Sequence, residues 1–202
     1  MIEDTIKLLE DLVATQPSVE RESLLGSAYK RLAMIDAAVG RDDEPAIRKM
    51  REHYNRAEKL GREAGLANVL YPALNGITAE VALNATRPEP VQLESDVFDR
   101  VRKTLVAQAR EEPDFWTVAG PTELGMWQAL DQRALAPEWP ALQEAFDDLY
   151  ARVSSPTAWA SVYDNARFVL TRYEKHAGNE EEKSAARAVL EKLQAFAEGA
   201  AS

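Results

Sequence analysis

The chain has 202 residues, of which 46% are hydrophobic and 29% charged, a composition typical of a folded protein that buries a real core. Its 34 acidic and 24 basic residues give a net charge of −10, which disfavours nucleic acid and anionic membranes, because both attract proteins rich in Lys and Arg. The sequence contains no cysteine, which excludes disulfides, thiolate catalysis and cysteine-based metal sites.

The charge of the whole chain favours a basic partner, or one recognised without regard to charge, and it also favours solubility. No apolar run approaches the length of about 18 residues that a membrane-spanning helix needs. Glu3 and Asp4 stand where a signal peptide would be basic, so no export signal is predicted. We therefore expect a cytoplasmic protein that forms a single helical-repeat domain over residues 1–202, or a piece of a larger protein.

Apolar residues recur with the helical period along almost the whole chain, and no stretch alternates as a β-strand does. This spacing predicts helices over residues 2–16, 19–40, 44–64, 72–83 and 94–111, a sixth from 114, a seventh that ends near 153, and two more over 157–176 and 180–198. An all-α fold of about nine helices follows.

Residues that favour helix ends and turns mark several of these boundaries. Ser18 is expected to cap the second helix, and Pro45 fits the first turn of the third. Pro88 and Pro90 predict a long loop. The pair Gly120-Pro121 leaves two alternatives for the sixth helix, either a kink or a short turn that separates two pieces.

The stretch from Glu22 to Ala33 resembles the first helix of a tetratricopeptide-type repeat. Leu25, Gly26 and Tyr29 stand where such a repeat has its leucine, its small residue and its aromatic. The small residue lets a neighbouring helix approach closely, and the aromatic fills the space between helices.

An interval of 31 residues also recurs, from Gly26 to Ala57, from Gly76 to Ala107 and from Gly120 to Ala151. These features predict a tetratricopeptide-like α-solenoid made of irregular helix–turn–helix pairs.

A resemblance to a known family extends this prediction. The segments Leu25–Arg31, Tyr71–Asn75 and Phe115–Trp116 resemble bacterial tetratricopeptide-like regions related to the TRAF-binding region of MAP3-kinases. The resemblance covers residues 20–173 and implies a protein-interaction scaffold rather than an enzyme. Bacterial members are sometimes joined to caspase-like or signalling domains. The chain departs from the family pattern at Gly120-Pro121, where a continuous helix is expected.

Catalytic and metal-binding patterns are weak. His53 is expected to be partly buried or exposed, His176 to cap a helix C-terminus, and neither has a metal-ligand partner at helical spacing. The acidic run from Glu180 to Glu182 is expected to favour the start of a helix. The sequence holds no Gly-x-Ser-x-Gly elbow and no phosphate-binding glycine loop. We therefore predict no enzymatic activity, no cofactor and no metal.

Five residues are predicted to contact a protein or peptide partner: Lys30, Arg31, Tyr71, Asn75 and Trp116. An asparagine on an apolar helix is able to hold a peptide backbone, and exposed tryptophans anchor interfaces. The alternatives are that Asn75 bonds a neighbouring backbone carbonyl and that the tryptophans fill gaps in the core.

Three functions remain open from the sequence alone. The first is a scaffold that binds a peptide or protein segment in the concave groove of the array. The second is a regulatory or structural segment that packs on another domain of a larger signalling or caspase-like protein. The third is a helical bundle that binds a small molecule.

Overall fold

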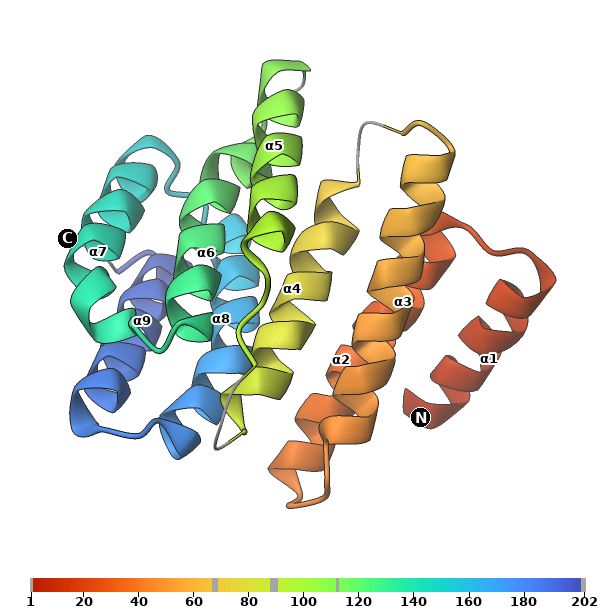
Figure 1. Ribbon diagram of the computed structural model, residues 1–202, viewed down its shortest axis with the longest axis horizontal. Helices are drawn as coiled ribbons and strands as arrows, with labels where there is room; N and C mark the ends of the chain where they lie inside the picture. Colours follow the sequence, from red (N-terminus) through yellow and green to blue (C-terminus); the bar gives the residue numbers. More distant parts are fainter. Residues whose placement is uncertain (1, 67–68, 88–90, 112, 201–202) are drawn as a thin grey trace. The chain divides into compact units, whose positions relative to one another are not determined.

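The computed structural model describes residues 2–66, 69–87, 91–111 and 113–200. Within these ranges the chain forms nine α-helices and no strand (Figure 1). In chain order they are α1 (Ile2–Thr15), α2 (Val19–Ala38), α3 (Glu44–Glu63), α4 (Leu70–Ala85), α5 (Ser95–Glu111), α6 (Phe115–Asp131), α7 (Leu135–Arg152), α8 (Pro156–His176) and α9 (Glu180–Glu198). The predicted all-α fold is confirmed.

Local signals in the sequence place most helix ends correctly. The Ser18 hydroxyl accepts a hydrogen bond from Arg21 N (3.2 Å) and so caps α2, as predicted. Pro45 lies in the first turn of α3, where its missing N–H costs nothing. Asn179 accepts from Glu182 N (2.8 Å) and caps α9.

The Gly120-Pro121 pair does not divide the sixth helix. α6 continues through Pro121, so the alternative with a separating turn is wrong. Asp114 and Thr117 form a reciprocal capping box that fixes the start of this helix. Pro88 and Pro90, which predict a loop before α5, lie outside the described residues.

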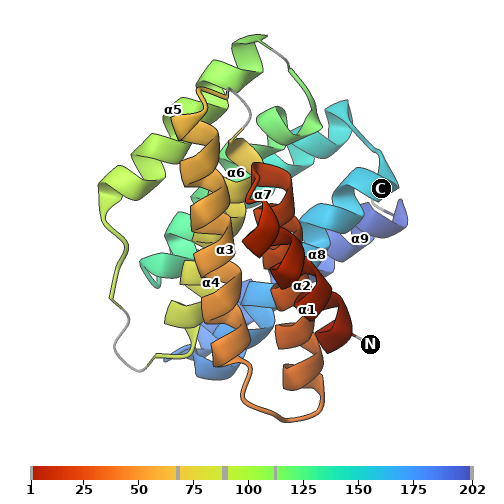
Figure 2. The ribbon, with the colours of Figure 1, turned by 90° about the vertical axis from the view of Figure 1, so that its right-hand side faces the viewer.

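Contacts within the chain divide it into two compact units, which are described separately. The N-terminal unit spans Met1–Leu83 and the C-terminal unit spans Asn84–Ser202. In the N-terminal unit α1 packs on α2 and α2 packs on α3, with successive helices antiparallel (Figures 1 and 2). In the C-terminal unit α5 packs on α6, α6 on α7, α7 on α9 and α8 on α9, and α6 also contacts α8.

The small residue and the aromatic of the Glu22–Ala33 stretch pack as predicted. A Cβ atom on Gly26 would lie 2.9 Å from the ring of Tyr54, so only glycine lets α2 approach the buried Tyr54 of α3 this closely. The Tyr29 ring is buried and stacks on His53 of α3, with ring centroids 5.4 Å apart and planes inclined by 5°. These two contacts bind α2 to α3.

The recurring interval of 31 residues does not mark equivalent packing. Ala57 is fully buried on α3, whereas Ala107 and Ala151 are exposed. The glycines also differ, because Gly120 lies against the side chain of Leu105 and Gly76 lies against Asn55. The interval therefore does not mark the same contact in each helix pair, which agrees with the irregular array that the sequence predicts.

Aromatic side chains form the core of the C-terminal unit. Trp159 is fully buried and lies at its centre, with the Phe196, Phe115 and Phe146 rings 4.7, 5.5 and 6.3 Å away. Its indole N–H donates to the Val153 carbonyl at the end of α7 (2.6 Å). The prediction that tryptophans fill the core is correct for Trp159, and Trp127 is buried as well.

Burial raises the pKa of three tyrosines above the ordinary value of 10.0. After burial, the further cause is the hydrogen bond to Glu10 for Tyr29, the neighbouring Tyr71 for Tyr54, and the hydrogen bond to Glu182 for Tyr173. Each phenol is thus held in its neutral form by the fold.

We expect the protein to lose stability in alkali. A phenol whose pKa is raised by folding stabilises the native state below the unfolded-state pKa of about 10, and this contribution is lost as the pH rises above it. The free energy of unfolding should fall by at most about 1.4 kcal/mol per pH unit for each such tyrosine. Urea unfolding between pH 8 and 11.5 (about 0.5-unit steps) measures this. Tyr29→Phe should flatten the decline, and a constant stability to pH 11.5 would contradict it.

Candidate functional site

A surface hollow lies between α2 and α4 of the N-terminal unit. Its volume is about 450 Å³, and it is lined by Val19, Glu20, Ser23, Leu24, Ser27, Tyr71 and Pro72. We call it the α2–α4 hollow. Leu24 is 49% exposed and Tyr71 is 53% exposed, although both have large apolar side chains. A hollow flanked by exposed apolar groups is typical of a binding surface.

Hydroxyl groups line one side of the α2–α4 hollow. The Ser27 hydroxyl lies 2.8 Å from the Tyr54 hydroxyl and 3.1 Å from the Tyr71 hydroxyl. The two tyrosine rings meet edge to face, with centroids 5.9 Å apart. The Ser23 hydroxyl is buried and has no hydrogen-bond partner among the described residues. The hollow thus combines apolar walls with polar groups able to bond a ligand.

Of the five predicted contact residues, Tyr71 lines this hollow. Arg31 does not line it, but lies one helical turn after Ser27 on α2. The Arg31 charge is close enough to act on the pKa of Tyr54, which it lowers slightly against the larger effect of burial. Arg31 is exposed and donates weakly to the Met34 sulfur (3.6 Å).

The other three predicted residues have different surroundings. Lys30 is 6% exposed and Asn75 is 5% exposed. The Asn75 amide donates to the Tyr71 carbonyl in its own helix (2.9 Å), rather than to a neighbouring helix or loop. Trp116 is 41% exposed and packs edge to face on Phe115, but it belongs to the C-terminal unit. Their predicted contacts with a partner stay predictions.

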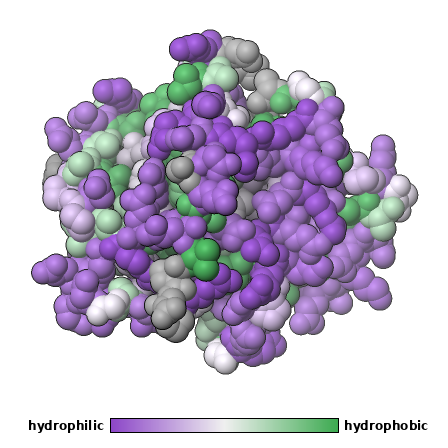
Figure 3. Space-filling view, in the orientation of Figure 1, coloured by the Kyte–Doolittle hydropathy of each residue, from purple (hydrophilic) through white to green (hydrophobic). Residues whose placement is uncertain are grey.

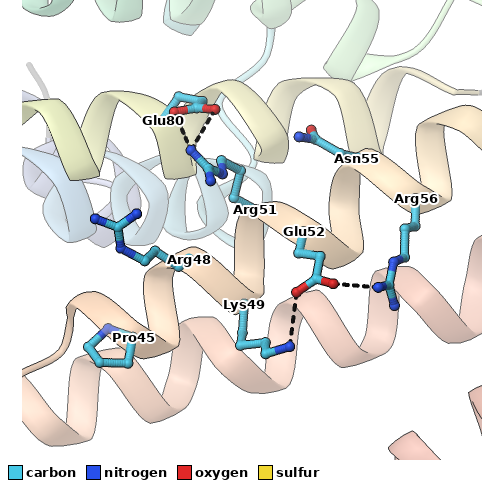
Figure 4. Close-up of a pocket in the computed structure, with 8 residues that line it drawn as sticks. All are labelled: Pro45, Arg48, Lys49, Arg51, Glu52, Asn55, Arg56 and Glu80. Atoms are coloured by element: carbon cyan, nitrogen blue, oxygen red, sulfur yellow. Dashed lines mark hydrogen bonds and ion pairs between the residues drawn. The ribbon is translucent and has the colours of Figure 1, made fainter. Parts of the chain in front are cut away.

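A second surface site, which sequence analysis did not single out, lies between α3 and α4 (Figure 4). This groove has a volume of about 660 Å³ and is lined by Pro45, Arg48, Lys49, Arg51, Glu52, Asn55, Arg56 and Glu80. We call it the basic groove, because it contains four basic and two acidic side chains. The molecular surface over α3 is hydrophilic in the view of Figure 3.

Ion pairs connect most charges of the basic groove. Arg51 reaches across to α4 and donates to both carboxylate oxygens of Glu80, each at 3.1 Å. Lys49 (2.9 Å) and Arg56 both pair with Glu52, so one carboxylate serves two cations. These two pairs lower the pKa of Glu52, Lys49 being the larger cause. Figure 4 shows Lys49 and Arg56 turned toward Glu52.

Comparison with protein-family models gives a match in the N-terminal part of the chain. Residues 2–80 match the family model Tetratricopeptide Repeats-Sensor. This match covers α1 to α3 and most of α4, and hence all residues that line both sites. No curated protein and no solved structure matches the chain. The predicted helical-repeat fold is thereby confirmed, with a tetratricopeptide-like region in the N-terminal unit, and such repeats are generally protein-binding.

A buried polar pair in the N-terminal unit also escaped the sequence analysis. His53 Nδ1 lies 2.7 Å from a carboxylate oxygen of Glu22, and both side chains are buried. The sequence analysis expects His53 to be partly buried or exposed, and this expectation is wrong, because the side chain is buried. Its partner stands 31 residues earlier on another helix, beyond the reach of any spacing rule for a single helix. The stacked Tyr29 completes this cluster and donates to Glu10 of α1 (2.6 Å).

The described residues form neither a metal-binding cluster nor a membrane-spanning helix. No group of three or more His, Asp and Glu side chains in the described part of the chain is arranged to hold a metal ion. None of the helices described is both long and apolar enough to cross a membrane. Two further surface hollows, of about 440 and 590 Å³, lie beside Trp139 on α7 and beside Ile2 and Ile35 on α1 and α2.

Proposed function

We propose that this protein is a protein-interaction module whose α2–α4 hollow binds a segment of a partner protein. The observation that carries the proposal is the exposure of Leu24 and Tyr71 beside a hollow of about 450 Å³. Water is displaced from such apolar surface when a partner covers it, and this favours association.

The chemistry of the hollow suits one apolar side chain next to a polar backbone group. The apolar walls come from Val19, Leu24 and Pro72. The hydroxyls of Ser27 and Tyr71 would bond a backbone carbonyl or amide of the segment, since a hydroxyl both donates and accepts. Arg31 would hold a carbonyl or carboxylate at the far end, because a guanidinium offers several donors in a fixed geometry.

Selection from a random peptide library tests this proposal. Peptides selected on the wild-type protein should share an apolar residue, and Leu24→Glu should weaken their binding by about tenfold or more, because a charge would then line the apolar wall. Leu8→Glu is the matched control, since Leu8 is 61% exposed on α1 and does not line the hollow. The proposal fails if no peptide is enriched, or if both variants bind the peptides equally.

The proposal also covers the family relationship, the source of the partner segment and the cellular location. A relationship to the TRAF-binding region of MAP3-kinases rests on Leu25–Arg31, Tyr71–Asn75 and Phe115–Trp116. The partner segment would come either from a separate protein or from another domain of a larger signalling or caspase-like chain. A scaffold without catalytic activity, located in the cytoplasm, fits both cases.

A further inference from the structure

The basic groove between α3 and α4 has the opposite charge to the chain as a whole. Its lining has four basic and two acidic side chains, and Arg48 also pairs with Glu44 just outside the lining. Four cations thus share three carboxylates, which leaves one positive charge in excess in a protein whose net charge is −10. None of its lining residues belongs to the α2–α4 hollow. A ligand for this groove would therefore be distinct from the segment proposed for that hollow.

The ion pairs of the basic groove are easily exchanged. The Arg48, Lys49 and Arg56 side chains are each about half exposed, at 51%, 50% and 52%. Ion pairs at such exposure contribute little to stability, so a new carboxylate is able to replace the old one at small cost. Glu52 already divides one negative charge between two cations. The groove therefore has unused capacity to bind negative charge.

The cations form a stripe along α3. Pro45, Arg48, Glu52 and Arg56 follow one another at intervals of three or four residues, and Lys49 lies four residues after Pro45 and three before Glu52. This spacing places them along one side of the helix. With a rise of about 1.5 Å per residue, the stripe is about 16 Å long, the length of about five residues of extended chain.

The second wall of the groove is fixed by α4. The Arg51–Glu80 pair is two-thirds buried or more and ties α3 to α4. The Asn55 amide oxygen lies 2.9 Å from the position that a Cβ of Gly76 would occupy, so the absence of a side chain on Gly76 makes room for it. Figure 4 shows Asn55 on the groove side of α3, where it offers an amide to a backbone ligand.

We infer that the basic groove binds an extended acidic protein segment of about five residues. Its carboxylates would pair with Arg48, Lys49 and Arg56, whose positions follow the length of the segment. A nucleic acid fits less well, because Glu52 and Glu80 within the groove would face a continuous row of phosphates. A segment with carboxylates at only some positions avoids these two glutamates.

A fluorescent peptide with five consecutive glutamates, titrated at low salt, tests the inference. It should bind saturably, and the same peptide with five glutamines should not. The double variant Arg48→Gln/Arg56→Gln should weaken binding by about fivefold to tenfold, since two charge-assisted pairs are lost. The matched control is Lys59→Gln/Arg62→Gln, two exposed α3 residues outside the groove, which should change binding by less than about twofold.

A second variant is predicted to improve binding. Glu52→Gln removes the carboxylate that competes for Lys49 and Arg56, and the glutamate peptide should bind about threefold tighter. The inference is overturned if the glutamate and glutamine peptides bind alike, if the control pair weakens binding as much as the groove pair, or if Glu52→Gln weakens it. It is also overturned if a thymidine decanucleotide displaces the peptide at a lower concentration than unlabelled peptide does.

Discussion

Replacing Glu182 by alanine is expected to lower the free energy of unfolding by about 3 kcal/mol. Glu182 lies in the first turn of α9 and is buried. Its carboxylate accepts hydrogen bonds from Leu135 N (3.1 Å), Ala136 N (3.0 Å) and the Tyr173 hydroxyl. One side chain of α9 thus holds the start of α7 and the end of α8.

The start of α7 depends on Glu182 because its own sequence offers no cap. The residue before the helix is Ala134, which has no side-chain acceptor, and the third helical residue, Pro137, has no N–H. Leu135 and Ala136 therefore carry the first-turn donors that need a partner, and Glu182 accepts from both. A buried donor without an acceptor costs about 1–3 kcal/mol. Glu182→Gln keeps one oxygen and should cost about half as much.

Tryptophan fluorescence during urea unfolding measures this effect, because all four tryptophans belong to the C-terminal unit. Glu181→Ala is the matched control, since Glu181 is the neighbouring residue and is exposed. Substitutions at such positions change stability by less than about 0.5 kcal/mol. Equal unfolding midpoints for the two alanine variants would show that Glu182 does not hold α7 and α8 together.

The helices themselves follow from local sequence signals. Ser18, Pro45 and the apolar period predict the bounds of α2 and α3 to within two residues, because capping and helical spacing involve neighbours along the chain. The contact of Gly26 with α3 is predicted for a related reason, because a small residue close in sequence to an aromatic residue is typical of the paired helices of tetratricopeptide-type repeats.

The partners of buried polar residues do not follow from local signals. Lys30 and Glu22 lie on the buried side of α2, which mixes polar and apolar residues, so the sequence does not distinguish its two sides. α4 is buried on nearly every side, and its apolar pattern does not show which way Asn75 points. The acidic run at Glu180–Glu182 predicts a helix start, but the bonds of Glu182 to α7 depend on how three helices pack.

The basic groove escaped prediction for a similar reason. In the sequence, basic residues at 48, 49 and 56 alternate with acidic residues at helical spacing, a pattern typical of an ordinary solvent-exposed helix face. Glu80 stands 29 residues after Arg51, and only the packing of α4 against α3 turns the face into a groove. A local excess of positive charge on the folded surface cannot be inferred from the net charge of the whole chain, which is −10.

Replacing His53 by alanine should lower the free energy of unfolding by about 3–4 kcal/mol. The change leaves the Glu22 carboxylate buried without its 2.7 Å partner and removes the ring on which Tyr29 stacks. Urea unfolding followed by far-UV circular dichroism gives the free energy, and hydrogen exchange of the α2 and α3 amides locates the effect. The protein contains only two histidines, so His176→Ala, at the exposed end of α8, is the natural control and should change stability by less than about 0.5 kcal/mol.

A double-mutant cycle separates the energy of the Glu22–His53 interaction from the cost of removing either side chain. Glu22→Leu alone should be costly, because His53 then loses its partner in the interior. The double variant Glu22→Leu/His53→Leu should be at least about 2 kcal/mol more stable than the sum of the single changes predicts, since two apolar side chains leave no polar group unpaired. Simple additivity would mean that Glu22 and His53 act independently, and that their 2.7 Å contact contributes nothing to the packing of α2 on α3.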